Sequence, residues 1–139
     1  MHAHLSVITL AVKDLAASFA FYHEGLGFPS KGIMGTEFEY GAVAFFELQH
    51  GLKLALWPQD SLSHDTGLSP SAFCPIQMTL GHNVNSPDVV DEIMQQAQLA
   101  GAKEIKPAQP TFYGGYAGYF QDLDGHLWEI VYNPHLDLI

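Results

Sequence analysis

The order of secondary-structure elements repeats along this chain, and this repeat constrains the fold more than any other feature. Each half reads as one strand, one helix and then three further strands, in about 70 residues. The expected strands are residues 5–12, 28–33, 38–48, 52–57, 75–81, 103–112, 116–121 and 127–132. One helix for every four strands predicts an α+β fold, with helices on one face of an antiparallel sheet.

Two amphipathic helices are expected, one in each half. In the first, apolar side chains recur every three or four residues from Leu15 to Leu26. The second begins with the capping residue Ser86, followed by Pro87 at the first helical position, and ends at Gly101. These signals place each helix directly after the first strand of its half.

The chain is expected to form a single domain, residues 1–139, because this is the length of one ordinary domain. Residues 1–57 and 75–135 are predicted to be two βαβββ modules. Residues 58–74 are polar and contain several Ser and Pro, so they are predicted to be a loop that links the modules.

The composition excludes some partners. Five Lys and Arg against 15 Asp and Glu give a net charge of −10, which would repel nucleic acid and anionic membranes. No apolar run is long enough for a membrane span and no signal-peptide pattern is found, so a cytoplasmic location is expected. Only 14% of the residues are charged, which indicates a surface covered by a second copy in a homodimer.

Two motifs carry a resemblance to a known superfamily. FY at 21–22 is followed by GLGF at 25–28, and the last hairpin reads DLDGHLWE at 122–129. With the repeated βαβββ unit, they resemble the glyoxalase, bleomycin-resistance and extradiol-dioxygenase proteins, also called the vicinal oxygen chelate superfamily. Leu123 stands where this superfamily usually has Pro. The resemblance implies two modules whose curved sheets form an open cup, with the helices outside.

The resemblance also implies where a metal would bind. Carried over by motif, its four ligand positions fall at Val7, Ala55, Gln77 and Glu129. Val and Ala offer no donor atom, and only Glu129 is a usual ligand. No cofactor is therefore expected, and a divalent metal is kept only as the alternative.

The last hairpin supplies the main candidate site. If it turns at 122–126, Tyr119 lies opposite Glu129 on one sheet face. Glu129 is the candidate catalytic residue: it orients a ligand or acts as a general base, or it is a remnant of the family site hydrogen-bonded to Tyr119 or Gln77. The candidate ligand-binding residues are Thr9, Trp57, Gln77, Tyr119, Phe112 and Tyr116.

The remaining polar residues are given structural interpretations. Cys74, the one cysteine, is expected to be a small buried side chain beside Pro75. The histidines, including His126 after the last turn, are expected to lie on the surface.

Three functions stay open. The first is binding of a small cationic or aromatic molecule without a metal, as in bleomycin-resistance proteins; the losses at Val7 and Ala55 and the acidity favour it. The second is a glyoxalase-type lyase or isomerase, or a dioxygenase, with an atypical metal set that includes Glu129. The third is a dimeric interaction module whose cup is filled by its own side chains.

Overall fold

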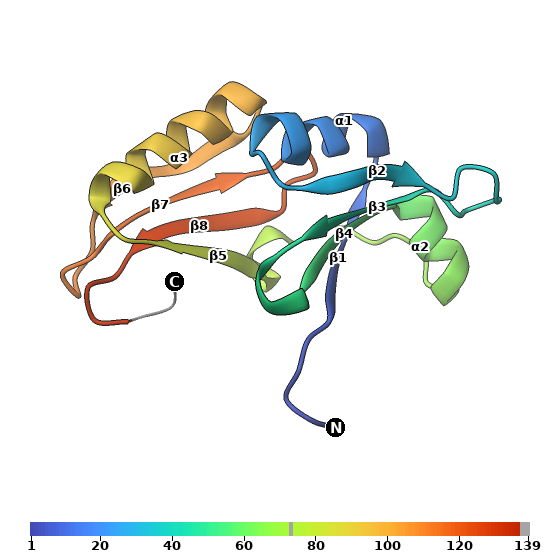
Figure 1. The fold of residues 1–139 in the computed structure, drawn as a ribbon, viewed down its shortest axis with the longest axis horizontal. Helices are drawn as coiled ribbons and strands as arrows, with labels where there is room; N and C mark the ends of the chain where they lie inside the picture. Colours follow the sequence, from blue (N-terminus) through green and yellow to red (C-terminus); the bar gives the residue numbers. More distant parts are fainter. Residues whose placement is uncertain (73, 137–139) are drawn as a thin grey trace. The chain divides into compact units, whose positions relative to one another are not determined.

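The computed structural model describes residues 1–72 and 74–136, and the chain forms two compact units, Met1–Ala72 and Phe73–Ile139 (Figure 1). The first unit contains β1 (Val7–Val12), α1 (Leu15–Ala20), η1 (Phe21–Gly25), β2 (Ser30–Met34), β3 (Val43–Glu47), η2 (Gln49–Gly51), β4 (Lys53–Pro58) and α2 (Gln59–Thr66). The second contains η3 (Pro75–Gln77), β5 (Thr79–Val84), α3 (Pro87–Ala100), β6 (Lys103–Pro110), β7 (Tyr116–Gln121) and β8 (Leu127–Tyr132). Among the described residues, no helix has the length and apolar character that a membrane crossing needs.

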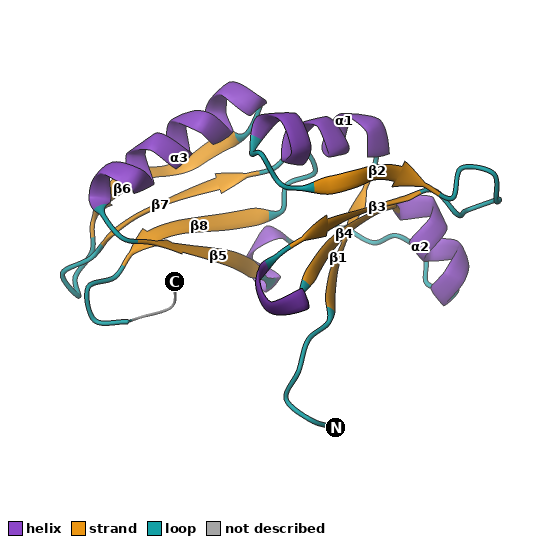
Figure 2. Cartoon of the chain, viewed as in Figure 1, coloured by secondary structure: helices purple, strands orange, loops and turns teal. Residues whose placement is uncertain are grey.

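The first unit is a four-stranded sheet in the order β1-β4-β3-β2, with α1 packed on one face (Figure 2). The strands pair in antiparallel fashion except β1, which joins β4 in parallel. Phe46 of β3 is fully buried, and its ring lies 5.6 Å from that of Phe19 in α1 and 5.8 Å from that of Tyr22. Because successive strand residues point to opposite faces, Val43 and Phe45 lie on the face away from the helix.

The second unit repeats this topology in the order β5-β8-β7-β6, again with one parallel pair, β5 with β8. The α3 helix begins at Ser86, whose hydroxyl accepts from the N–H of Val89, and ends at Gly101 in the left-handed conformation. The rings of Phe120 and Trp128 stack with centroids 6.1 Å apart on the buried face of the sheet. Each unit therefore buries one sheet face under its own helix.

The α+β class is confirmed, and so is the predicted register of the last hairpin. The sheets are not purely antiparallel as expected, because each contains one parallel pair, β1 with β4 and β5 with β8. Tyr119 pairs with Glu129, and Gln121 pairs with Leu127. The position of the turn fixes this register, because a slip of one residue would move every side chain of the strand to the opposite face of the sheet.

Two expected elements differ in the structure. Residues 58–74 were predicted to be a loop, but they include α2, a mostly polar and exposed helix that ends at Gly67 in the left-handed conformation. Its sequence lacks a clear apolar stripe, which is why periodicity missed it. The strand predicted from residue 75 begins at Thr79, because Pro75–Gln77 forms a short 3₁₀ turn. Pro75 has no N–H to donate to a strand ladder.

Candidate functional site

The open face of the first sheet carries a cavity of about 310 Å³. It is lined by Thr9, Gly41, Val43, Phe45, Ala55 and Trp57. Leu54 and Leu56 of β4 are buried on the helix face, so the residue between them points the other way. That residue is Ala55, which pairs with Thr9 on one side and with Phe45 on the other. The small side chain of Ala55, between the larger side chains of Phe45 and Trp57, leaves the space that forms the cavity.

The loop before β3 forms the edge of this cavity and is held by several contacts. The indole N–H of Trp57 donates to the backbone oxygen of Tyr40 at 3.2 Å. Tyr40 adopts a left-handed conformation, with φ 58°, and its ring stacks on that of His64 with centroids 4.0 Å apart. A Cβ at Gly41 would lie 2.7 Å from the backbone oxygen of Gly35, so no larger residue fits there. These contacts form the Trp57 side of the cavity in advance of any ligand.

The open face of the second sheet carries a polar pair. Tyr119 donates its hydroxyl proton to Glu129 Oε1 at 2.8 Å. Burial, the hydrogen bond to Glu129 and the negative charge of Glu129 raise the pKa of Tyr119 to about 12. On the other side of Glu129, Gly81 of β5 is its strand partner, and the space beside Gly81 is open. Glu129 therefore accepts the hydrogen bond from Tyr119 that was considered from the sequence. Its role towards a ligand stays a prediction.

The other sequence-predicted residues lie apart from this pair. Gln77 is in the 3₁₀ turn rather than on β5 and lines a different cavity. The side chain of Phe112 is fully exposed, and its ring meets that of Tyr113 edge-on with centroids 5.2 Å apart. Tyr116 donates to Asp91 of α3 at 2.9 Å, so it lies on the helix face of β7. Only Thr9 and Trp57 of the predicted set share a cavity in the first unit.

The turn between β7 and β8 contains a buried carboxylate. Asp122 Oδ1 accepts from the backbone N–H groups of Asp124, at 2.9 Å, and of His126, at 2.8 Å. Asp122 Oδ2 lies 2.7 Å from His126 Nδ1. The side chains of Asp122 and His126 are 1% and 11% exposed, respectively. The turn therefore fixes the orientation of the imidazole ring.

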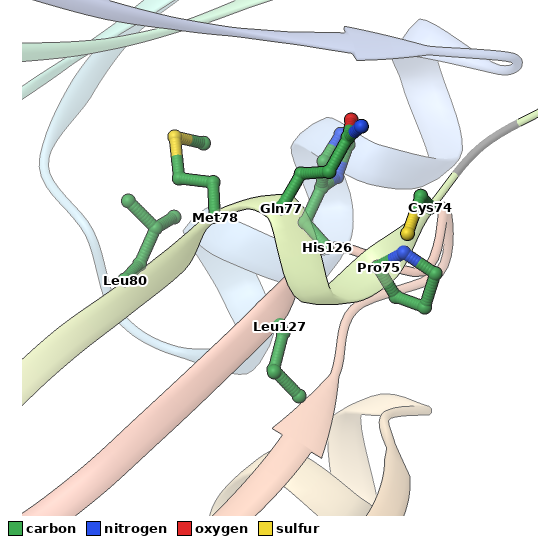
Figure 3. Close-up of a pocket in the computed structure, with 7 residues that line it drawn as sticks. All are labelled: Cys74, Pro75, Gln77, Met78, Leu80, His126 and Leu127. Carbon is green, nitrogen blue, oxygen red and sulfur yellow. The ribbon is translucent and has the colours of Figure 1, made fainter.

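His126 also lines a smaller cavity, of about 120 Å³, in the second unit (Figure 3). Its polar lining residues are His126, Gln77 and Cys74; Figure 3 places the last two on the same turn of chain. Cys74 is exposed, which corrects the expectation of a buried side chain. It lies in extended backbone before Pro75, outside the packed sheet, so no core residues cover it.

Sequence reasoning missed several residues that line the two cavities. Val43 and Phe45 alternate with the buried Ala44 and Phe46, and that alternation would have placed them on the open face. His126 was expected to lie on the surface, but its side chain is only 11% exposed. The spacing of four residues between Asp122 and His126 across a tight turn could have indicated their pairing. No sequence signal places Cys74 beside the hairpin.

Side chains that could hold a cation are present, but not where the resemblance placed them. Val7 and Ala55 supply no donor, so the superfamily's ligand positions do not fit a metal. In the turn, however, Asp122, Asp124 and His126 offer ligand atoms that all lie within 4.8 Å of one another.

Solved structures similar to this chain share its fold over nearly the whole length. A glyoxalase-related enzyme from Fulvimarina pelagi is 35% identical with a TM-score of 0.82, and the alignment covers 96% of this chain and 90% of that one. The fosfomycin resistance protein FosX from Listeria monocytogenes is 28% identical with a TM-score of 0.69, and 96% and 95% of the two chains are covered. No curated protein matches the sequence.

The expectation of no cofactor is wrong. A FosX variant complexed with Mn(II) and 1S,2S-dihydroxypropylphosphonic acid is 26% identical to this chain, with a TM-score of 0.67 and coverage of 94% and 90%. Together with the Asp122, Asp124 and His126 group, this overturns the earlier reasoning. The ligand positions implied by the resemblance lie on strands or next to them, whereas Asp122, Asp124 and His126 belong to the turn between β7 and β8.

Most of the chain also matches a model of a known protein family. The model described as "Glyoxalase/Bleomycin resistance protein/Dioxygenase superfamily" matches residues 4–130, which cover most of each unit. The matched region contains the repeated topology, both cavities and the Tyr119–Glu129 pair. The chain therefore belongs to the Glyoxalase/Bleomycin resistance protein/Dioxygenase superfamily.

Proposed function

We propose that this protein binds a compact, largely apolar small molecule in the cavity of its first unit. The observation that carries the proposal is the volume of about 310 Å³, at the lower end of the roughly 300–1,000 Å³ typical of small-molecule sites. The lining is mostly apolar and includes two aromatic rings, those of Phe45 and Trp57. The hydroxyl of Thr9 is the one side-chain hydroxyl in the described lining, so it is the group that would orient a ligand.

The walls of the cavity favour a flat ligand. Trp57 is fixed by its hydrogen bond to Tyr40, so its ring loses little freedom when a ligand stacks on it. A net charge of −10 raises the local concentration of cations, and a positively charged ring would also gain from cation–π contact with Trp57. A cationic aromatic molecule is therefore the class that we expect to bind best.

A thermal-shift screen tests this proposal, with neutral and cationic aromatic compounds of similar size as probes. A ligand at about 100 times its Kd adds roughly 2.7 kcal/mol to the stability of the folded protein and raises the Tm by several degrees. Thr9→Val removes the hydroxyl without changing the shape, and is expected to weaken binding of every ligand that carries a hydrogen-bonding group.

The matched control is Thr36→Val, at an exposed turn position outside the cavity lining. It should leave the thermal shift unchanged. Equal loss of binding in Thr9→Val and Thr36→Val would argue against the cavity as the binding site, and so would a screen in which no compound shifts the Tm.

A second candidate is an enzyme that uses Glu129 as a proton acceptor. The observation that favours it is the Tyr119–Glu129 hydrogen bond on an open sheet face beside Gly81. Hits from the screen would be incubated with the protein and followed by mass spectrometry. In an enzyme of this kind, Glu129→Gln abolishes conversion of the compound but preserves the thermal shift that the compound produces. If the wild-type protein chemically alters none of the compounds that bind to it, the result would count against catalysis.

A further inference from the structure

We propose that the loop between β2 and β3, residues 35–42, is a movable wall of the cavity in the first unit, with Tyr40 as the latch that holds it closed. A ligand stacked on Trp57 stabilises the closed position. The inference rests on the proposed function, because it describes how binding to that same cavity is regulated. Figure 1 shows the loop extending beyond the ends of β2 and β3.

The 35–42 loop is a compact segment whose two ends touch. The backbone N–H of Phe38 donates to the oxygen of Gly35 at 3.1 Å, and the N–H of Gly41 donates to the oxygen of Phe38 at 3.1 Å. A Cβ at Gly41 would lie 2.7 Å from the backbone oxygen of Gly35, so the loop closes tightly on itself. Residues 36–40 are exposed. A loop with close ends, internal hydrogen bonds and an exposed middle can move as one body about those ends.

Tyr40 ties this loop to the rest of the first unit. Its backbone oxygen accepts from the indole N–H of Trp57 on β4 at 3.2 Å. Its ring stacks on that of His64 in α2, with centroids 4.0 Å and planes 12° apart. Apart from strand pairing at its two ends, the hydrogen bonds and ring contacts that join the loop to other described elements all involve Tyr40. The closed position therefore depends on one residue.

The backbone of Tyr40 opposes these contacts. Its φ of 58° lies in the left-handed region, which residues with large side chains adopt rarely because Cβ crowds the following carbonyl oxygen. Such strain persists only where surrounding contacts hold it. Here the contacts are one hydrogen bond and one ring stack near the surface, so the loop opens more readily than the sheet beneath it unfolds.

Trp57 connects the latch to the cavity. Its side chain lines the cavity, and its indole N–H holds the loop through Tyr40. Opening of the loop releases the indole, so a ligand stacked on the ring in its present orientation binds the closed form. The ligand and the closed wall then stabilise each other, because coupling between two such equilibria is reciprocal.

The first test measures how fast the indole hydrogen of Trp57 exchanges with water, by NMR of the ¹⁵N-labelled full-length chain. The second tryptophan, Trp128, is buried and serves as an internal reference. Tyr40→Ala keeps the left-handed backbone but removes the ring, and should raise the Trp57 exchange rate roughly 3- to 10-fold, the effect of losing one aromatic pair. Tyr40→Gly also relieves the strain, so its rate should lie between those of the wild type and Tyr40→Ala.

Phe38→Ala is the matched control, since it removes an exposed ring from the same loop and keeps the Cβ that lies against Gly41. It should change the Trp57 exchange rate by less than about twofold. Equal rates in Tyr40→Ala and Phe38→Ala would overturn the proposal. An equal rise at Trp128 would overturn it too, because the chain would then be unfolding as a whole.

The second test adds N-methylquinolinium, a flat cationic aromatic probe, to the wild type. A ligand that binds only the closed form slows Trp57 exchange by the factor 1 + [L]/Kd, which is about 11 at ten times its Kd. If the probe raises the Tm but leaves the exchange rate unchanged, the coupling is wrong and the proposed binding function stands. If the probe does not raise the Tm, the proposed function loses support, and the Tyr40 variants still decide whether the loop is latched.

Discussion

Ala55→Leu is the most direct test of the cavity in the first unit, and Ala44→Leu is its matched control. Both alanines are at most 1% exposed, and they lie on neighbouring antiparallel strands of one sheet. Ala55 faces the cavity of about 310 Å³, whereas Ala44 faces the core under α1, on the same side as Phe46. The same substitution therefore enters empty space in one variant and packed side chains in the other.

The magnitudes follow from this difference. Leu adds three carbon atoms, each worth about 0.8 kcal/mol when buried, so filling the cavity can stabilise the fold by up to roughly 2 kcal/mol. At Ala44 the extra atoms have no room, and overpacking a core costs about 1–3 kcal/mol. We expect the free energy of unfolding to differ by about 2 kcal/mol or more between the two variants, with Ala55→Leu the more stable.

Urea unfolding gives both numbers, with an unchanged m-value as the sign that each variant still folds in the same way. Ala55→Leu should also abolish the thermal shift produced by any ligand of the cavity, because the added side chain occupies its space. If both variants lost the same stability, Ala55 would not face a cavity, and the proposed binding site would fall with it.

Three further perturbations have defined outcomes. Asp122→Ala removes a buried acceptor of three hydrogen bonds and should lower the free energy of unfolding by about 3 kcal/mol, measured in urea with chelator present. Because the pKa of Tyr119 is raised to about 12, the stability that its protonated hydroxyl contributes is complete below pH 10 and is lost as the pH rises towards 12. Glu129→Gln should lower the pKa of Tyr119 but keep it above 10, since burial is the largest cause of the shift. ¹³C NMR of the tyrosine ring would measure this pKa. Gly41→Ala should cost about 1–3 kcal/mol because its Cβ would lie 2.7 Å from backbone, whereas Gly81→Ala, beside open space, should be neutral or stabilising in the same urea assay.

The fold was largely predictable because it depends on short-range patterns. The two-residue alternation and the turn at 122–126 are enough to pair Tyr119 with Glu129, and the Ser86 cap with Pro87 places the start of α3. The α2 helix was missed because its polar sequence gives no periodic signal. The homodimer and the cytoplasmic location, inferred from composition, stay predictions.

The sites were less predictable because they depend on which segments meet in space. Alternation placed Thr9 and Trp57 on one face, but the cavity between them needs a small residue at Ala55 and a loop held at Gly41. Both conditions depend on how separate segments pack together, which the pattern within one segment does not indicate. In the same way, nothing in the sequence near Cys74 indicates that the β7–β8 turn lies beside it.

The repeated topology also explains why the two units can carry different chemistry. In each unit the helix-covered face supplies the buried core, so substitutions there meet packed side chains and cost stability. The open faces carry no such constraint, and equivalent positions on β4 and β8 hold different residues. In β4 the open-face position is Ala55, which leaves room for a ligand, whereas in β8 it is Glu129, which is held by a phenol. The repeated βαβββ topology thus lets a single chain keep two packed sheets, of which one carries an apolar cavity on its open face and the other a polar pair.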